Sequence, residues 1–205
     1  MPQTMKPAVR RRILEAARDE LVAVGFLSAT VGAIARRAGV STGNVYRYFE
    51  NKGALFEAVV DDAFVAELDR LLDARVAALT RLPDVRSLDV PAAERQTELL
   101  DFWIAHRERV VIALDRCEGT RHGAFGARFV DRLVAHTLAH LQSRASRPLP
   151  DHTAFVLRSL FDGTRRTIVA ILEHHAAPDD VRAAFATFWS FQLAGLAGLE
   201  QEVLR

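Results

Sequence analysis

Apolar residues recur at helical spacing along most of the chain, and this pattern predicts an all-α protein. The first such segment covers residues 7–24, and its apolar side chains fall on one helix face: Val9, Ile13, Ala17, Leu21 and Val24. Gly25 follows directly and is the residue type that most often ends a helix. The segment therefore predicts an amphipathic first helix that stops at Gly25.

Three residues that accept hydrogen bonds from free backbone N–H groups mark the starts of the next helices. Thr30 precedes a short periodic segment that Gly39 ends, and Ser41 precedes a second short segment through about Phe49. Asn51 precedes a longer periodic run, which predicts one continuous helix over residues 52–79. Three helices and a long fourth are therefore expected before residue 80.

The rest of the chain alternates between periodic segments and breaks. A loop is expected at 82–84, an irregular connection at 115–126 and a proline-marked break at 146–150. Helices are predicted over 91–114, 127–144, 151–175, where Asp151 would be the cap, and from 178 nearly to the C-terminus. This gives about nine helices and no strand. We therefore expect an all-α fold with an N-terminal domain over residues 1–52 and a C-terminal helical domain over residues 53–205.

The composition is that of an ordinary globular protein, but the charge is unevenly distributed. Half of the 205 residues are hydrophobic and 26% are charged. No secretory signal or membrane-spanning run is evident, so we expect a cytoplasmic protein. Residues 1–52 hold nine Lys or Arg and four Asp or Glu residues, a net charge of +5, whereas the remainder carries −4. A polyanion would be attracted to the first quarter, although charge alone leaves chance clustering equally open.

Residues 30–52 have the layout of a helix-turn-helix, in which the second short helix enters the major groove of DNA. Gly39 permits the tight turn, and Val45 and Phe49 can dock the second helix on its neighbours. This leaves a polar set on its outer face or at its amide end: Thr42, Gly43, Asn44, Tyr46 and Arg47. Asn and Arg read adenine and guanine edges, and free amides at a helix N-terminus bind phosphate. The pattern therefore predicts DNA binding.

The same segment resembles the N-terminal domain of the TetR family of bacterial repressors. The resemblance covers roughly residues 8–60 and rests on one register of matching positions: Thr30, Ile34-Ala35, Ala38-Gly39-Val40-Ser41, Gly43, Val45, Tyr46, Tyr48, Phe49, Lys52, Leu55 and Phe56. Many positions in one register are far more specific than a lone helix-turn-helix spacing. The family often has His at the position of Tyr48, and tyrosine keeps a hydrogen-bond donor there.

The resemblance assigns roles to single residues of this segment. Phosphate contacts are implied for Thr30, Tyr46, Tyr48 and Lys52. Base contacts are implied for residues that follow the capping Ser41, namely Thr42, Gly43, Asn44 and Arg47. The alternative for the two tyrosines is that they only cover the three-helix core, and the alternative for Arg36 and Arg37 is a solvated face. Residues 10–12 are all arginine and form either an arm in the minor groove or, as we favour, a basic helix start.

The last two helices have the features of a dimer interface. A single helix-turn-helix reads too few base pairs, so such proteins bind palindromic sites as dimers. Wide apolar faces on these helices would form a four-helix bundle across a twofold axis, and the resemblance implies the same two helices. The residues expected there are Leu157, Phe161, Ile168, Phe185, Phe188, Trp189, Gln192 and Leu196. The alternative is that this face belongs to the protomer's own core.

A small-molecule pocket is expected in the middle of the C-terminal domain, where bulky aromatic residues occur with a few polar atoms. The candidates are Phe102, Trp103, His106, Val110, Cys117, Phe125, Phe129, Phe155 and Phe161. Such a lining is typical of apolar ligand sites, although any single aromatic residue belongs more often to the core. Arg107, Arg116 and Arg165 could meet an anionic ligand, but we favour surface positions or ion pairs for them.

Other chemistries have weaker support. His136 and His140 have the spacing of a two-histidine metal site, but no third ligand is evident. Cys117 is the single cysteine and is expected to be a small buried hydrophobe rather than a redox sensor. The chain has no nucleophile elbow, phosphate loop or dinucleotide fingerprint. We therefore expect no enzyme activity, no metal and no cofactor.

Together these expectations describe a homodimeric repressor that binds palindromic operator DNA and is released by a small-molecule effector. In the expected switch, the helix over 52–79 tilts and changes the spacing of the two DNA-reading helices from one turn of DNA, about 34–36 Å. A helix-turn-helix protein that binds no ligand, or one that activates transcription, is the nearest alternative.

Overall fold

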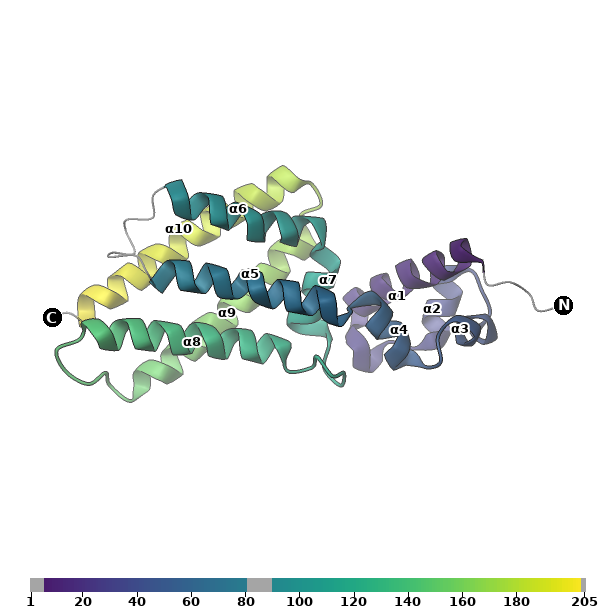
Figure 1. The fold of residues 1–205 in the computed structure, drawn as a ribbon, viewed down its shortest axis with the longest axis horizontal. Coiled ribbons are helices and arrows are strands. Elements are labelled where there is room, and N and C mark those ends of the chain that lie inside the picture. The colour runs from purple at the N-terminus through teal and green to yellow at the C-terminus, as the bar shows by residue number, and fades with distance from the viewer. Residues whose placement is uncertain (1–5, 81–89, 204–205) are drawn as a thin grey trace. The chain divides into compact units, whose positions relative to one another are not determined.

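The computed structural model describes the backbone of residues 6–80 and 90–203 and the side chains of residues 6–77 and 98–202. Within these ranges the chain is helical and contains no strand, which confirms the predicted fold class (Figure 1). The helices are α1 (Pro7–Ser28), α2 (Val31–Ala38), α3 (Thr42–Tyr48), α4 (Lys52–Val59), α5 (Asp62–Thr80), α6 (Val90–Ala105), α7 (Arg107–Val111), α8 (Phe125–Arg144), α9 (His152–His174) and α10 (Pro178–Val203). A π-helical turn, Ile112–Arg116, follows α7. The loop expected at 82–84 lies outside the described residues.

The chain divides into two compact units. Unit 1 consists of residues 1–67 and 108–125, and unit 2 consists of residues 68–107 and 126–205. Unit 1 therefore takes α1 to α4, the start of α5 and most of the segment from α7 to α8. Unit 2 takes the rest of α5 together with α6 and α8 to α10.

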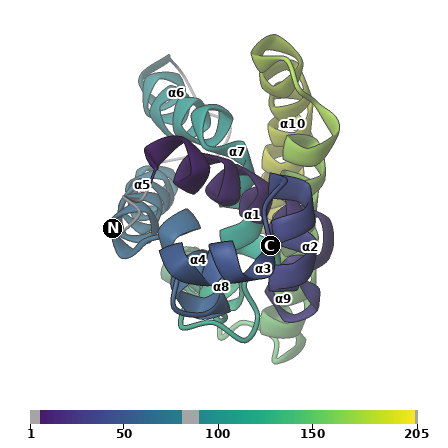
Figure 2. The ribbon, with the colours of Figure 1, turned by 90° about the vertical axis from the view of Figure 1, so that its right-hand side faces the viewer.

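Unit 1 is built around the inner faces of its short helices (Figure 2). Most of the apolar residues that the periodicity places inward are buried there: Ile13, Ala17, Leu21, Ile34, Ala35, Val45, Leu55 and Phe56. Of the others on the first helix, Val9 is half-buried and Val24 is 46% exposed, so the inward position predicted for Val24 is wrong. Gly25 interrupts α1 with a φ of 73°, a value that favours glycine, and one more turn follows the kink. The predicted helix end at Gly25 is therefore a kink after which the helix resumes.

Unit 2 is a layered bundle of long helices. Figure 1 shows α5, α6, α8 and α10 beside one another, with α9 running against α10. Its core is formed by large apolar side chains, which include Leu68, Leu72, Trp103, Phe129, Leu157, Ile168 and Phe185. None of the helices in the described ranges combines the length and apolar character that crossing a lipid bilayer needs.

The prediction of one helix over residues 52–79 is wrong. At Val60, where φ is −123° and ψ is 85°, the backbone leaves the helical region. Asp61 Oδ1 then accepts a hydrogen bond of 2.8 Å from the backbone N–H of Phe64 and so caps a new helix. Apolar residues resume at helical spacing after the break, and no glycine or proline marks it, so periodicity alone hides the joint.

Two further predictions about helix ends are wrong. The helix expected over 91–114 is divided into α6, α7 and the π-helical turn, although no glycine or proline separates them. Asp151 does not cap α9 with its side chain and is itself in the helical region. The N–H of Thr153 instead donates to the carbonyl of Pro150 at 2.9 Å. Backbone geometry after the two prolines therefore starts α9.

Candidate functional sites

The helix-turn-helix is fixed by the side-chain caps that the sequence predicts. Thr30 Oγ1 accepts from the N–H of Ala33 and Ser41 Oγ accepts from the N–H of Asn44, both at 3.1 Å. Gly39 has a φ of 65° in the turn between α2 and α3. These contacts satisfy first-turn amides of both helices and set the direction in which α3 leaves the turn.

The two faces of α3 differ sharply in exposure. Val45 and Phe49 are 1% and 6% exposed and hold α3 against the core of unit 1. Thr42, Gly43 and Arg47 are exposed, Asn44 is half-buried and Tyr46 is 52% exposed. A methyl group built on Gly43 would meet no atom within 4 Å, so the surface above the start of α3 is open. The predicted base-contacting residues therefore lie on a surface that a DNA groove could reach.

Two residues expected at phosphates are held by protein contacts instead. Lys52 Nζ donates to the carbonyl oxygens of Phe26, Leu27 and Ala29 at 2.7, 3.3 and 3.0 Å. An ammonium group has three donors, so these contacts use all of them at the C-terminal end of α1. The hydroxyl of Tyr48 accepts from the backbone N–H of Lys6 at 2.9 Å. Both side chains fix the ends of α1 in this structure.

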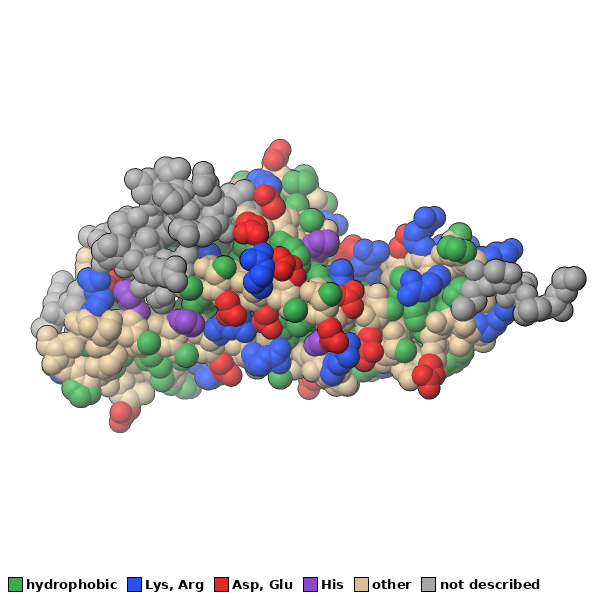
Figure 3. Space-filling model, viewed as in Figure 1, with side chains coloured by type: hydrophobic (Ala, Val, Ile, Leu, Met, Phe, Trp, Pro, Cys, Tyr) green, Lys and Arg blue, Asp and Glu red, His purple; other side chains and the backbone are tan. Residues whose placement is uncertain are grey.

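The remaining cations of the first quarter are divided between surface and ion pairs. Arg37 lies 3.4 Å from Glu20 and 3.8 Å from Asp19, whereas Arg36 is exposed. Residues 10–12 lie within α1, as expected for a basic helix start, and the guanidinium of Arg10 lies over the ring of Phe49. On the face drawn in Figure 3, Lys and Arg side chains project from unit 1.

The α4–α5 joint in unit 1 is held by charged side chains of the segment that follows α6. Arg109 donates to Asp61 Oδ2 at 3.0 Å, and its guanidinium lies 4.0 Å from the centre of the Phe64 ring. Burial lowers the pKa of Arg109, and the carboxylate of Asp61 opposes this shift. Arg121 lies 3.0 Å from Asp62. Sequence analysis missed this cluster, because its members are far apart in the chain.

The structure does not bring the predicted pocket residues together. Val110, Cys117 and Phe125 are buried in unit 1, where Cys117 Sγ donates to the carbonyls of Ala113 and His122 at 3.2 Å. In unit 2, the rings of Phe102 and His106 contact each other at the half-buried edge of α6. Phe155 is 73% exposed. Three of the predicted residues, Trp103, Phe129 and Phe161, do line one cavity.

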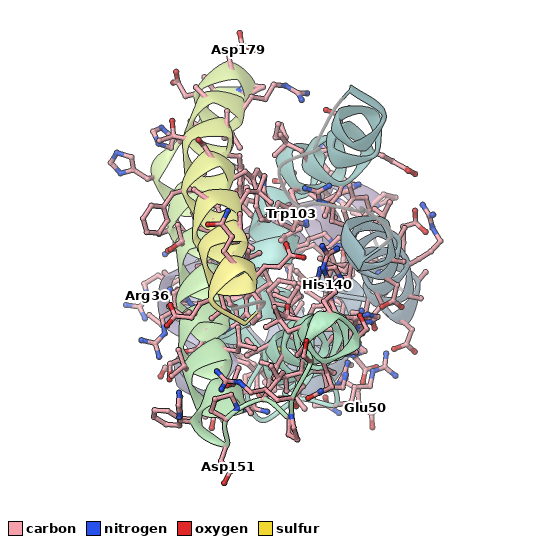
Figure 4. All side chains as sticks on the ribbon, turned by 90° about the vertical axis from the view of Figure 1, so that its left-hand side faces the viewer. Arg36, Glu50, Trp103, His140, Asp151 and Asp179 are labelled. Carbon is pink, nitrogen blue, oxygen red and sulfur yellow. The ribbon has the colours of Figure 1, made fainter. Side chains whose placement is uncertain are left out.

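This cavity lies among the helices of unit 2 and has a volume of about 50 Å³. Figure 4 labels Trp103, which lies in the interior beside α10, where its ring contacts that of Phe185. The lining is mainly apolar and consists of Leu72, Arg75, Val76, Leu99, Trp103, Phe129, Leu133, Phe161, Thr164, Trp189, Gln192, Leu193 and Leu196. One charged residue, Arg75, is among them, and it is only 4% exposed.

Sequence reasoning missed Arg75 and considered three other arginines. Arg107 donates to the carbonyl of His175 at 3.0 Å, Arg116 to that of Val22 at 3.2 Å, and Arg165 to Asp162 at 3.0 Å. Protein partners therefore hold these three, as favoured above. Arg75 falls at helical spacing with Leu68, Leu71 and Leu72, which are buried, so it lies on the inward face of α5.

The predicted dimer residues lie largely inside the protomer. Leu157, Ile168 and Phe185 are fully buried, and four others line the cavity: Phe161, Trp189, Gln192 and Leu196. Other large apolar residues of α9 and α10 are exposed instead, namely Phe155 (73%), Val156 (42%), Leu160 (56%) and Phe191 (76%). Phe188, Trp189, Gln192 and Leu196 are half-buried, so the predicted dimer interface stays a prediction, and the exposed outer faces of α9 and α10 are a second candidate surface.

Of the two histidines considered for metal binding, His136 is exposed and His140 contacts a carboxylate. His140 Nε2 lies 3.3 Å from Glu200 Oε1, and Arg144 Nε lies 2.7 Å from the same oxygen. Across the part of the chain that the structure describes, no group of three or more His, Cys, Asp or Glu side chains is placed to hold a metal ion.

Comparison with known proteins identifies the family. Residues 13–59 match the model of the bacterial regulatory proteins of the tetR family. The HTH-type transcriptional regulator BetI of Escherichia coli O157:H7 is 39% identical over 174 residues, 80% of this chain and 84% of that protein. BetI of Klebsiella pneumoniae strain 342 is 42% identical over 80 residues, 39% of each chain. A solved structure of the regulator FadR from Bacillus subtilis in complex with stearoyl-CoA covers 91% of this chain and 97% of that one, at 15% identity and a TM-score of 0.45.

The N-terminal helix-turn-helix, the family model and the BetI relatives define a DNA-binding regulator. The chain belongs to the TetR family of transcriptional regulators.

Proposed function

We propose that the protein is a repressor that binds palindromic operator DNA as a homodimer, catalyses no reaction, and releases the operator when a small molecule binds in unit 2. The observation that carries the proposal is the two-faced character of α3. Its inner face is fixed by Val45 and Phe49, while Thr42, Gly43 and Arg47 are exposed on a unit whose first 52 residues carry a net charge of +5. A short, rigid, polar helix on a basic unit suits a major groove.

The roles of the site residues follow from their positions. We assign base reading to Asn44 and Arg47, because amide and guanidinium groups match purine edges. Phosphate contacts fall to Tyr46 and to the amide ends of α2 and α3, next to Thr30 and Ser41. Tyr48 and Lys52 contribute indirectly, since they fix the ends of α1 against which α2 and α3 pack.

Dimerisation is assigned to the outer faces of α9 and α10. Phe155, Val156, Leu160 and Phe191 are large exposed apolar residues on two neighbouring helices. Gly163 and Gly195 lie on the same helices, and a methyl group at either would meet no atom within 4 Å. Small residues between large apolar ones permit close approach of a second helix pair, and a twofold axis would bring the two exposed faces together.

The proposed switch acts at the joint between α4 and α5. Because Val60 breaks the helix, α4 can change direction relative to the start of α5 without bending a continuous helix. Arg109 and Arg121 hold Asp61 and Asp62 at this joint. Movement of Arg109 and Arg121 would therefore shift the start of α5. A ligand that favours one arrangement of the joint would change the spacing of the two α3 helices in the dimer.

The test is binding to the DNA upstream of the protein's own gene, measured by fluorescence anisotropy against a shuffled duplex of equal length. We expect binding of the native duplex at least about a thousandfold tighter than of the shuffled one. The logarithm of the binding constant should fall linearly with the logarithm of salt concentration. Equal binding of the two duplexes would overturn the proposal.

A further inference from the structure

Arg75 is a buried cation for which the described part of the chain supplies no hydrogen-bond partner. It is 4% exposed, and none of its Nε, Nη1 and Nη2 atoms is hydrogen-bonded to a described residue. Burial lowers the pKa of Arg75, and no neighbouring charge opposes that shift. Its guanidinium lies 5.6 Å from the centre of the Trp189 ring, a contact that compensates only a small part of the lost hydration.

The carboxylates around unit 2 do not neutralise Arg75. Asp69 and Asp73, on the same helix, pair with Arg132 at 2.9 and 2.8 Å. The buried Glu200 pairs with Arg144 and His140. No residue that lines the cavity is acidic. The cavity therefore contains a positive charge that the described part of the protein leaves uncompensated.

Apart from Arg75, the polar groups that line the cavity provide one more hydrogen-bond donor and no further charge. Trp103 Nε1 is buried and has no hydrogen-bond partner, so a second N–H is unsatisfied. Thr164 and Gln192 satisfy each other, since Gln192 Nε2 donates to Thr164 Oγ1 at 2.5 Å, and Thr164 Oγ1 also lies 3.2 Å from the carbonyl of Leu160. Unsatisfied buried donors cost stability, and an acceptor that reaches them removes that cost.

We propose that Arg75 anchors the carboxylate of an anionic ligand with an apolar body, which rests on the ligand-responsive function proposed above. A guanidinium offers parallel N–H groups that match the two oxygens of a carboxylate. Trp103 Nε1 supplies a further donor to the same group. Thr164 and Gln192 bond to each other, and the other walls are aliphatic and aromatic, so the lining suits a hydrocarbon body and gives a second charge on the ligand no partner.

The size of the cavity links binding to movement. A volume of about 50 Å³ is room for a carboxylate or one or two water molecules, since each water occupies about 30 Å³ of liquid. The apolar body of the ligand therefore has to displace side chains contributed by α5, α6, α9 and α10. Binding at Arg75 would change the packing of these helices, which is what a ligand-dependent switch requires.

The two tryptophans make the proposal directly testable. Trp103 and Trp189 are the only tryptophans in the chain, and both line the cavity. Intrinsic fluorescence of the full-length protein therefore reports occupancy. The probes are hexanoate and benzoate, their neutral amides hexanamide and benzamide, and the cation hexylamine. We expect each carboxylate to bind at least about tenfold more tightly than its amide, and hexylamine not to bind.

Variants separate the charge of Arg75 from its bulk. Arg75→Met keeps an unbranched side chain but removes the guanidinium, and it should weaken carboxylate binding at least about tenfold while amide binding changes by less than about threefold. Arg75→Lys should keep part of the preference for the anion. Arg70→Met, at an exposed arginine of the same helix that pairs with Glu98, is the matched control and should bind as the unsubstituted protein does. Thermal unfolding monitored by circular dichroism verifies that each variant is folded.

Three outcomes overturn the proposal: no probe binds, amides or the amine bind as tightly as carboxylates, or Arg75→Met binds carboxylates unchanged. A parallel anisotropy assay with operator DNA distinguishes failure of the anionic-ligand proposal from failure of the proposed function. If carboxylates bind through Arg75 but leave the DNA complex intact, the ligand site is supported and the ligand-dependent release of DNA is excluded. If DNA binds and the carboxylates do not, the DNA-binding function stands and the anionic ligand is excluded.

Discussion

The helix-turn-helix of unit 1 and the cavity of unit 2 differ in how far their polar groups are satisfied by hydrogen bonds within the protein. In the helix-turn-helix, Thr30 and Ser41 cap the helices and Lys52 satisfies three carbonyls at the end of α1. In the cavity, the three nitrogens of Arg75 and the indole nitrogen of Trp103 have no hydrogen-bond partner among the residues that the structure describes. A surface that must fit a rigid duplex gains from being fixed in advance. A site that must respond to a ligand gains from groups that only the ligand satisfies.

The same contrast applies to apolar surface. The apolar side chains of α2 and α3, including Ile34, Val45 and Phe49, are buried within unit 1. On α9 and α10, by contrast, Leu160 and Phe191 remain more than half exposed. The short helices of unit 1 thus bury their apolar side chains within the protomer, whereas unit 2 leaves an apolar face exposed and, among the described residues, a buried cation without a hydrogen-bond partner.

The largest expected effect breaks the proposed dimer. Phe191→Glu places a carboxylate on the exposed face of α10, and a twofold axis repeats it in the partner. Loss of about 2–3 kcal/mol of apolar burial per protomer, with added charge, should raise the dimer dissociation constant at least about a hundredfold. Sedimentation equilibrium measures this. Ala139→Glu, at an exposed position on α8, is the control. If the Phe191→Glu protein remained a dimer, the interface would have to lie on another surface.

The next effect sharpens the contrast in polar satisfaction. If the free protein bears the cost of an unpaired buried cation, Arg75→Met should raise its free energy of unfolding by about 1–4 kcal/mol. Urea denaturation without ligand measures the change. Arg70→Met, at an exposed arginine, should change stability by less than about 0.5 kcal/mol. Destabilisation by Arg75→Met alone would mean that Arg75 is satisfied in solution.

A third prediction concerns the surface of α3. Arg47→Ala should cost about 1–3 kcal/mol at one base position of the operator and leave the other positions unchanged, if the guanidinium makes a bidentate contact. Competition binding with single-base variants of the operator measures this. Arg36→Ala, at an exposed cation on α2, should weaken binding to all duplexes alike. A change of base preference in Arg36→Ala and none in Arg47→Ala would assign reading to α2.

The smallest effect tests whether the helix-turn-helix is fixed by its caps. Ser41→Ala removes the acceptor for the N–H of Asn44 and should lower the free energy of unfolding by about 1 kcal/mol. Denaturation monitored by circular dichroism measures it. Ser28→Ala, at an exposed serine of α1, should have less than half that effect. Equal effects in the two variants would show that the Ser41 cap adds nothing.

Local signals predicted much of the fold but little of unit 2's site. The caps at Thr30, Ser41 and Asn51 are read from residue type and position, because capping involves only neighbouring residues. The break at Val60 was missed because apolar residues continue at helical spacing across it, although Asp61, the cap of α5, is a local signal. Arg75 was missed because an arginine is ordinarily exposed, even though it falls on the apolar face of α5.

The sequence by itself determined the all-α class, the helix-turn-helix and its outward and inward residues, because periodicity and capping act over a few residues. Tertiary structure alone decided which apolar face each long helix buries. Both α9 and α10 carry large apolar residues on more than one face, so periodicity cannot choose between core, cavity and exposed surface. Packing of α5 and α6 against them turned Phe161, Trp189 and Leu196 to the cavity and left Leu160 and Phe191 outside. The same packing enclosed Arg75, because burial depends on neighbours that the local sequence does not contain.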